Sequence, residues 1–570
     1  MKNKGLLACL LALVMLLSLC SITWADEEGG SGSNTAPSAT NVAKIGENNY
    51  GTLTEAIAAV SADEVIELVE NVIVEEKIVI NKAVTINGKG HSILYGDAYT
   101  GTMFEIAADG SLLLQNTVID GENAWTWIET GPETKWFSDT IQVTENGKEL
   151  TAETFLVKGG SLTLGAGSVV RNCVYNKGDV SYNDDCGVIK ADGGTVIFDG
   201  ASVNTVAGTV FVGNQTSLAL RGATTISGNY GCGNKGGLFI VAGSTATMEG
   251  STSIRNNKAW VRSGVIFGVI NTAELTMNGG EITENELRWG GSNTSGPMIC
   301  VESGGKFTMN GGSITNNVGK LAGAIASRWV TNNGTADNGI HLNGGTISGN
   351  TAKVDSWNNA QVYVRGTLNI GENMTVEGPV VVNDAGILNN KGTIDGKLII
   401  NHRTATANSS GNVKEINVSD GKMTVTSGYY GNDPTSYLAE GYCLVTFDPN
   451  GGQPAQLYLV VAANAKASKP NCVSKEGFNT ATWMKNGQVY DFETPVTENI
   501  TLVAEWSNSS STPEKPGHGN RPTHHDSTDT STDGNVTSAK TFDAGIALYV
   551  GMSLLSLTGS ALVVTKKKRG

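Results

Sequence analysis

The sequence is poor in several residues on which particular functions depend. Its 39 lysine and arginine residues are outnumbered by 54 aspartate and glutamate residues, giving a formal net charge of −15. Nucleic-acid-binding proteins carry basic patches, so this balance argues against a nucleic-acid partner. The eight cysteines include no CxxC pair and no Cys/His pair with metal spacing, so we expect no zinc site. Aromatic residues make up only 6% of the chain, whereas 73 residues are glycine, which suits a turn-rich β protein.

One phrase recurs between residues 223 and 350: an apolar residue, a glycine-rich step, Ile, two further residues and Asn. Clear copies are Met277–Asn285, Met309–Asn317 and Leu342–Asn350, and looser copies end at Asn229 and Asn257. The isoleucines of the five copies lie 28, 28, 32 and 33 residues apart, at Ile226, Ile254, Ile282, Ile314 and Ile347. A period of this length indicates one supersecondary unit that is stacked on itself and buries its core only by repetition.

Within each repeat, runs of three to five residues alternate between apolar and polar side chains, as in Phe307–Met309 and Ser313–Thr315. Such runs predict short strands, and nothing inside a repeat is long enough for a helix. We therefore predict a parallel β-helix in which the five isoleucines form one buried column. The Gly-Gly steps and the terminal Asn of each repeat are expected at corners with positive φ. Asn at one corner can also stack its amides into a hydrogen-bonded ladder.

Both ends of the chain carry segments that direct it to a membrane. Lys2 and Lys4 precede the apolar run Leu6–Leu19, and Thr23-Trp24-Ala25 predicts signal-peptide cleavage before Asp26. Ala544–Thr565 is uncharged and mostly apolar, and as a helix it would span about 33 Å, enough for a bilayer. The basic tail that follows predicts a cytoplasmic C-terminus and an extracellular body.

This C-terminal arrangement resembles that of Gram-positive wall-anchored proteins, whose sorting signal is a Leu-Pro-x-Thr-Gly pentapeptide, an apolar span and a basic tail. Ser538–Phe542 occupies the pentapeptide position, and only Thr541 matches. The resemblance implies anchoring to the membrane or cell wall, with Thr541 at the sorting position. A plain membrane anchor is the alternative.

Val84–Ile93 resembles the opening of right-handed parallel β-helix proteins of the pectate-lyase-like superfamily. Together with the repeats, the resemblance covers about residues 42–435. Ahead of it, Gly51–Val60 has a helical apolar stripe behind a Thr, which predicts a short helix covering the open first coil. This architecture hosts lyases, hydrolases and adhesins alike, so it implies a fold and not a reaction.

Residues 441–506 differ in character from the repeats. Val445–Gly452 runs from a strand into a turn, and Lys475–Phe478, Tyr490–Thr497 and Leu502–Trp506 follow. This segment is similar to the Listeria–Bacteroides repeat, the B-repeat module of internalin-type surface proteins. The resemblance implies a small β-grasp-like domain that serves as a spacer or adhesive unit. We interpret Trp483 and Trp506 as its core, and we expect a disulfide between Cys443 and Cys472 because both fall in this module.

The predicted organisation is all-β in its folded parts. It comprises a signal peptide (1–25), a disordered N-terminal segment (26–41), a right-handed parallel β-helix with a capping helix (42–435), the repeat-like module (441–506), a disordered Ser/Thr/Asp/Pro-rich stalk (507–540) and a transmembrane anchor with a basic tail (541–570).

An acidic group on the β-helix offers candidate catalytic residues. Asp184, Asp185 and Asp199 stand out, with Asp179 and Asp192 nearby, because paired carboxylates can serve as general acid and base. In lyases of the resembling fold, such acidic clusters bind calcium, so Ca²⁺ is the one cofactor left open. The Asn-Thr-Asp, Gly-His-Asp and Arg-Ile-Lys signatures of polygalacturonases are absent. Solvated loop acids are the alternative interpretation.

An aromatic group offers candidate ligand-binding residues. The coil pattern lapses between Gly121 and Phe155, and this insertion carries Trp125, Trp127 and Trp136. Trp260 and Trp289 lie beside arginines in the repeats, and tryptophan faces stack on sugar rings. Trp329 follows the apolar strand of its coil whereas Trp260 and Trp289 precede theirs, so these rings cannot form one straight ladder. Edge packing of coil loops is the alternative.

Together these features predict a non-catalytic, adhesin-like surface protein of a Gram-positive bacterium. Its expected partner is a carbohydrate or another extracellular surface ligand, with the membrane reached through the C-terminal helix. The alternative is a secreted β-helix polysaccharide lyase or glycoside hydrolase. Carboxylates clustered within about 5 to 10 Å in a groove would favour the enzyme, and an aromatic surface without such a pair would favour binding.

Overall fold

The structure is a computed structural model that describes residues 41–123, 125–128, 140–143, 148–175, 187–231, 235–259, 261, 263–288, 296–328, 339–353 and 359–508, with backbone alone for 125–128 and 140–143. Four predicted features lie outside these ranges: the signal peptide, the stalk beyond residue 508, Thr541 and the apolar run Ala544–Thr565. Among the described residues, no helix has the length and apolar character needed to cross a membrane.

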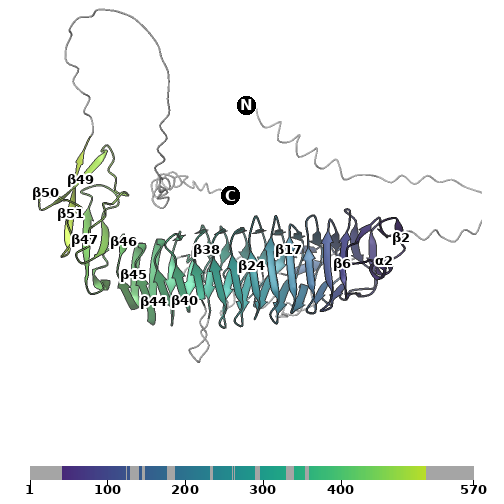
Figure 1. The fold of residues 1–570 in the computed structure, drawn as a ribbon. Helices are drawn as coiled ribbons and strands as arrows, with labels where there is room; N and C mark the ends of the chain where they lie inside the picture. The colour runs from purple at the N-terminus through teal and green to yellow at the C-terminus, as the bar shows by residue number, and fades with distance from the viewer. Residues whose placement is uncertain are drawn as a thin grey trace, which may run out of the picture. The chain divides into compact units, whose positions relative to one another are not determined.

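From β3 to β45 the chain winds through repeated coils, which follow one another in Figure 1. Each complete coil contributes one strand to each of three parallel ladders, here called A, B and C. The A ladder contains β5 (Ile78–Ile80), β8 (Phe104–Ile106), β13 (Phe155–Val157), β16 (Gly187–Asp192), β19 (Thr209–Gly213), β23 (Phe239–Ala242), β27 (Phe267–Ile270), β31 (Ile299–Val301), β35 (Ile325–Ser327), β39 (Val362–Val364) and β42 (Val380–Val382).

The B ladder follows A in each coil. It contains β3 (Val65–Leu68), β6 (Ala83–Asn87), β9 (Ser111–Gln115), β14 (Ser161–Leu164), β17 (Thr195–Asp199), β20 (Ser217–Arg221), β24 (Thr245–Met248), β28 (Glu274–Met277), β32 (Lys306–Met309), β36 (Gly339–Leu342), β40 (Thr367–Ile370) and β43 (Ile387–Asn390).

The C ladder completes each coil. It contains β4 (Val72–Val74), β7 (Ser92–Tyr95), β10 (Val118–Asp120), β15 (Val169–Arg171), β18 (Ser202–Asn204), β21 (Thr225–Ser227), β25 (Ser253–Arg255), β29 (Glu281–Thr283), β33 (Ser313–Thr315), β37 (Thr346–Ser348) and β41 (Thr375–Val376). The last two coils are single long strands, β44 (Thr393–Ser409) and β45 (Asn412–Val425), which pair along all three ladders.

The predicted isoleucine column is confirmed. Consecutive members face each other as register partners in the C ladder, and all are buried: Ile226, Ile254, Ile282, Ile314 and Ile347. The apolar core is continuous along the coils. The fold is therefore all-β and β-helix-like, as the period predicts, while its right-handed sense stays a prediction.

The terminal asparagines of the repeats form the predicted amide ladder. Each Nδ2 donates to the Oδ1 of the next at 2.9–3.0 Å, and that Oδ1 also accepts the preceding asparagine's backbone N–H at 2.9–3.1 Å. The other Nδ2 hydrogen goes to a main-chain carbonyl, such as that of Ile254 for Asn285 at 2.9 Å. All five members are buried: Asn229, Asn257, Asn285, Asn317 and Asn350. The ladder thus joins successive coils from inside.

The prediction that these asparagines have positive φ is wrong. The residue before each of them has it instead: Gly228, Asn256, Glu284, Asn316 and Gly349, with φ between 53° and 67°. This left-handed residue makes the corner, which leaves the following asparagine free to place its amide inside. The Gly-Gly steps behave as predicted, because Gly312 has φ +82° and a Cβ there would lie 2.5 Å from the Gly280 carbonyl oxygen.

A fourth, short ladder lies at this asparagine corner, between C and the next A strand. It is a separate sheet of β22 (Tyr230–Gly231), β26 (Lys258–Ala259), β30 (Glu286–Leu287), β34 (Val318–Gly319) and β38 (Thr351–Ala352). We call it the corner ladder. It gives these coils four sides rather than three.

The first coil is closed by a helix and a hairpin. The predicted helix is α2 (Leu53–Ala59), and Thr52 forms a capping box with Glu55 through two 3.1 Å hydrogen bonds. Its Leu53 and Ile57 belong to the coil core. The edge of β3 is covered by β1 (Ala43–Ile45), which also pairs with β2 (Asn48–Tyr50). The hairpin therefore shares the capping role that the sequence assigned to the helix alone.

Residues 442–507 form a mixed five-stranded sheet, here called the module. Its strand order is β48 (Leu457–Ala462), β47 (Tyr442–Asp448), β51 (Ile500–Ser507), β49 (Thr480–Lys485) and β50 (Gln488–Val489). Only β47 and β51 are parallel, as expected of a β-grasp-like sheet, but no helix crosses the sheet between residues 442 and 507. Trp483 lies in the module core, as predicted.

Strand pairing joins the module to the last coil. β48 pairs antiparallel with β46 (Gly428–Tyr430), which continues the C ladder after β45. Leu444 and Val460 are buried in the coil core rather than in the module core. The short 3-10 helix η2 (Thr435–Tyr437) lies between β46 and β47. The module thus covers an edge that the last coil would otherwise expose.

We expect Val460→Asp to release the module from the last coil. Val460 is 1% exposed, so an aspartate there would bury an uncompensated carboxylate at a cost of at least about 3 kcal/mol. Limited proteolysis should then cleave between residues 431 and 441. Val489→Asp is the matched control because Val489 is 69% exposed, and equal protease resistance of the two variants would contradict the expectation.

The predicted disulfide between Cys443 and Cys472 is wrong, because both are free thiols. Sharing a module does not place two sulfur atoms at bonding distance. Cys443 is instead a buried core residue of the module, and Cys472 packs against that core. Cys173 is also free, and burial raises the pKa of its thiol to about 12, which makes it a poor nucleophile.

Candidate functional site

The described members of the acidic group do not form a catalytic pair. Asp199 is ion-paired with Arg221, whose Nε lies 3.0 Å from Asp199 Oδ2. Asp192 accepts a hydrogen bond from Asn214. The two aspartates end the consecutive strands β16 and β17, and each is engaged by a different side chain. Asp184 and Asp185 lie outside the described residues.

Metal binding has no support in the part of the chain that the structure covers. Its His, Cys, Asp and Glu side chains form no group of three that could hold an ion. The sequence predicts no cofactor, with Ca²⁺ as the alternative, and Asp179, Asp184 and Asp185 lie outside the described residues.

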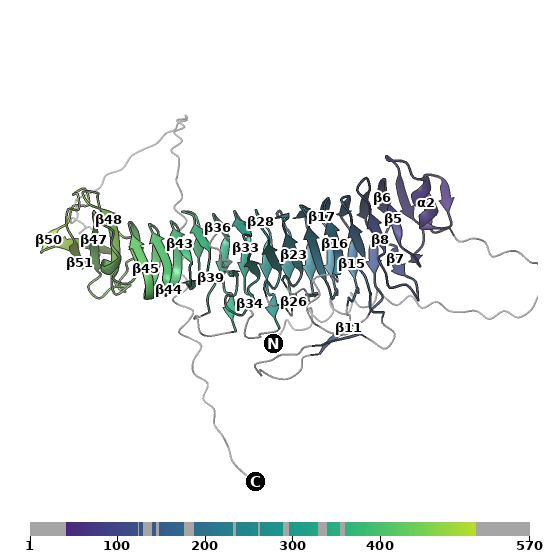
Figure 2. The same cartoon turned by 90° about the horizontal axis from the view of Figure 1, so that it is seen from below.

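The tryptophan insertion leaves the coils at the corner between the C and A ladders. Trp125 and Trp127 lie on β11 (Trp125–Ile128), which pairs antiparallel with β12 (Thr140–Val143) in a separate sheet beside the coils (Figure 2). Trp136, Trp260 and Trp289 lie outside the described residues. In the sequence, Trp260 and Trp289 follow the corner-ladder strands β26 and β30, whereas Trp329 follows the A strand β35. This difference in position agrees with the argument that these tryptophans cannot form one straight ladder.

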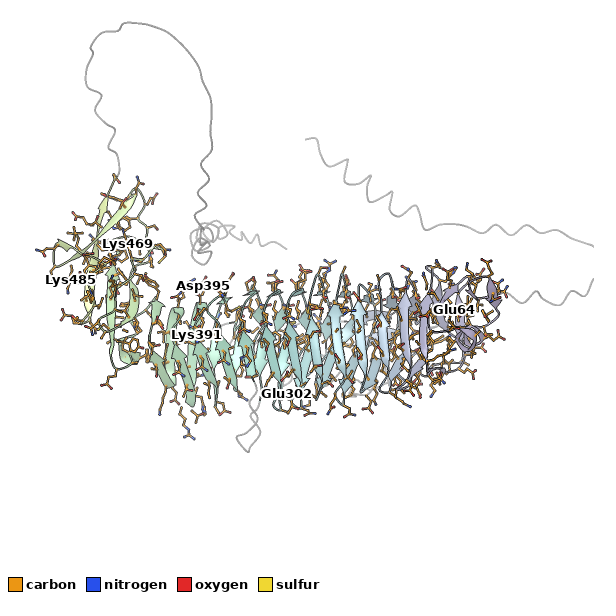
Figure 3. The ribbon with its side chains drawn as sticks, in the orientation of Figure 1. Glu64, Glu302, Lys391, Asp395, Lys469 and Lys485 are labelled. Carbon is orange, nitrogen blue, oxygen red and sulfur yellow. The ribbon has the colours of Figure 1, made fainter. Side chains whose placement is uncertain are left out.

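A buried carboxylate, Glu302, lies at the end of β31 in the coils (Figure 3). Its Oε2 is 3.4 Å from Lys235 Nζ, and its Oε1 accepts the hydroxyl hydrogen of Ser263. Arg328 Nη1 also donates to Ser263 Oγ at 3.2 Å. These residues come from successive coils, so the network ties the coils together and compensates the buried charge.

The module carries an open groove of about 780 Å³ at the C-terminal end of β51. Its apolar lining comes from Phe478, Met484, Val503 and Trp506, and its polar lining from Asn450, Lys475, Asn486, Thr501 and Glu505. Phe478 and Val503 are each 37% exposed, whereas most large apolar side chains among the described residues are buried. One lysine and one glutamate are its only charged lining residues, so the lining has no net charge.

Two aromatic rings on one side of the groove are held in place by neighbouring groups. Trp506 donates its indole N–H to the Pro449 carbonyl oxygen at 2.7 Å. Phe478 lies 6.3 Å from Trp506 between ring centroids, with their planes tilted by 56°. Lys475 Nζ sits 5.1 Å from the Phe478 centroid and donates to the Asn450 carbonyl oxygen at 2.9 Å.

The opposite part of the lining comes from the sheet and its hairpin turn. Met484 pairs with Val503 across β49 and β51, which brings the two apolar side chains together. Asn486 and Gly487 form the two-residue turn between β49 and β50, with φ of 50° and 80°. Thr501, Val503 and Glu505 alternate with Leu502, Ala504 and Trp506 along β51, so the groove lining draws on residues from both faces of the sheet.

Comparison with known proteins bears on this module. Residues 444–505 match the Listeria-Bacteroides repeat domain. Domains of this family occur in extracellular surface proteins, so the Listeria-Bacteroides module and the β-helix-like coils together fit an extracellular protein. The chain matches no curated protein and no solved structure. The pectate-lyase-like relationship of the coils therefore stays a resemblance.

The sequence did not point to the groove, because Trp506 was interpreted as core. In the structure Trp506 packs against the module core, as predicted, but it is only half-buried and lies beside Phe478. Strand alternation carries a usable signal: Trp483 and Leu502 point into the module core, so Met484 and Val503 must point out. Apolar residues at outward positions mark a surface that is available for contact.

Proposed function

We propose that the protein is a non-catalytic, adhesin-like binding protein displayed on the cell surface, which contacts carbohydrate or another extracellular surface. The observation that carries the proposal is the Listeria-Bacteroides module joined by strand pairing to a β-helix-like stack of coils. Stacked coils extend by repetition and hold their neighbours rigidly, which suits a scaffold that is displayed beyond a module lying on its anchor side. Anchoring through residues 541–570 is part of the proposal.

The described acidic residues support binding over catalysis. Asp199 is engaged by Arg221, and Glu302 by Lys235 and Ser263, so these carboxylates stabilise coils. A secreted polysaccharide lyase or glycoside hydrolase that uses the Asp179–Asp199 region is the second candidate.

A glycan array run beside a reducing-end release assay on the full chain tests the proposal. We expect bound glycans and no release, with Asp184→Asn and Asp185→Asn leaving both readouts unchanged. Asp199→Asn should also leave binding unchanged, apart from weakening an exposed ion pair worth less than about 1 kcal/mol. Release of reducing ends that disappears in Asp184→Asn or Asp185→Asn would establish the enzyme instead.

A further inference from the structure

We propose that the groove on the Listeria-Bacteroides module is a binding site for a neutral oligosaccharide or polysaccharide segment. This inference rests on the proposed surface-binding function and locates its ligand site in the module rather than at the tryptophans of the coils. It also commits to the chemistry of the ligand: uncharged sugar rings that stack on Phe478 and Trp506 and bond to the amide and hydroxyl groups around them.

The lining matches a sugar ring in both of its chemical properties. A pyranose has an apolar C–H face and a rim of hydroxyl groups, and ring faces of Trp and Phe stack against the former. Phe478 and Trp506 supply two neighbouring rings whose centroids lie 6.3 Å apart and whose planes are tilted by 56°, with Lys475 Nζ 5.1 Å from the Phe478 centroid. Thr501, Asn450 and Asn486 supply hydroxyl and amide groups at the border of the same groove.

Charge selects among the extracellular polymers that such a surface could take. Lys475 and Glu505 offset each other, and Lys475 is already engaged with the Asn450 carbonyl oxygen and the Phe478 ring. A sulfated or uronic-acid polymer needs several free cations, and this lining offers one lysine beside a glutamate. The groove therefore complements a neutral chain, and its openness admits an interior segment of a polymer as well as an end.

The aromatic surface is pre-formed, which lowers the entropy that binding must overcome. The Trp506 indole is fixed by its hydrogen bond to Pro449 and by close packing on Gly452, where a Cβ would lie 2.7 Å from Trp506 Cζ2. Asn450 is fixed in turn, since its Nδ2 donates to the Ala504 carbonyl oxygen at 3.1 Å. The groove border thus keeps its shape without a ligand.

The test measures binding of the full chain to neutral hexasaccharides of glucose, mannose and N-acetylglucosamine, with heparin as the acidic comparator, by isothermal titration calorimetry. At least one neutral probe should bind, and Phe478→Ala should weaken it by about tenfold or more through the lost stacking face. Binding should change less than about twofold between about 0.1 M and 1 M salt, because no ion pair is involved.

Two further variants separate a site from a fold defect. Val503→Lys places a bulky charge at an exposed groove position and should also weaken binding, while Val489→Ala, an exposed apolar position outside the lining, should not. All three should keep the wild-type urea midpoint. Neutral glycan binding that survives both groove variants would overturn the groove assignment and leave the surface-binding function intact. Binding of heparin alone would overturn the neutral ligand class. Binding of none of the four probes would overturn the groove proposal and leave contact with a non-carbohydrate surface as the surface-binding function.

Discussion

Asn285→Ala should lower the free energy of unfolding by about 4 kcal/mol or more, because it removes one rung from the buried amide ladder. The Asn285 side chain donates to the Ile254 carbonyl oxygen and to Asn317 Oδ1, and it accepts from the backbone and side-chain nitrogens of Asn257. An alanine would leave the backbone N–H and one side-chain N–H of Asn257 buried without their acceptor, each costing about 1–3 kcal/mol, and would remove one donor from the Ile254 carbonyl.

Urea unfolding gives the stability change, and hydrogen exchange locates it. The backbone N–H of Asn257 should exchange far faster in the variant, because its acceptor is gone. Asn310→Ala is the matched control: Asn310 also bonds Asn278 and Asn343 in a ladder across coils, but on the exposed surface. It should cost less than about 1 kcal/mol. Equal losses in the two variants would show that burial of the amides contributes nothing.

Ile282→Ala should cost about 2 to 5 kcal/mol, the range for truncating a buried aliphatic side chain. Ile282 is 0% exposed and is stacked between Ile254 and Ile314, so the coils on both sides hold the cavity open. Because each coil contacts only its neighbours, the loss should appear first as local opening of this part of the stack.

The comparison variant for Ile282→Ala is Ile387→Ala on β43, where the side chain is 40% exposed. We expect it to cost less than about 1 kcal/mol, because little apolar surface returns to water. Differential hydrogen exchange across β25, β29 and β33 checks the local effect. Unchanged exchange in these strands would refute the column as a stabilising element.

The periodic part of this protein could be predicted from sequence because every repeat places the same residue types at equivalent positions. Ile282 and Asn285 recur with their neighbours at one spacing, so parallel stacking brings equivalent residues together without further information. Which residue takes the left-handed corner was not predictable by type, since Glu284 takes it in one coil where Gly228 does in another. The position in the coil imposes the left-handed conformation there, even on a residue type such as Glu that rarely adopts it.

The groove and the cysteines show where sequence analysis stops. Asn450, Phe478 and Trp506 lie far apart along the chain, and the pairings of β47 and β49 with β51 bring their segments together. No periodic pattern in the sequence indicates that these segments come together. Cys443 and Cys472 posed the same problem, because their separation depends on the path of the chain between them.

Under the proposed anchoring through residues 541–570, the parallel pairing of β47 with β51 has a mechanical consequence. These strands are the first and the last of the module, and Val445 lies opposite Ile500 while Asp448 lies opposite Val503. Tension that enters at Tyr442 and leaves at Ser507 pulls the two strands along their length in opposite directions. The hydrogen bonds between them then carry the load together instead of breaking one at a time. If the module held a cell under fluid flow, the force would shear the hydrogen bonds between β47 and β51. The force would reach the coils through residues 431–441 and through the bonds between β48 and β46.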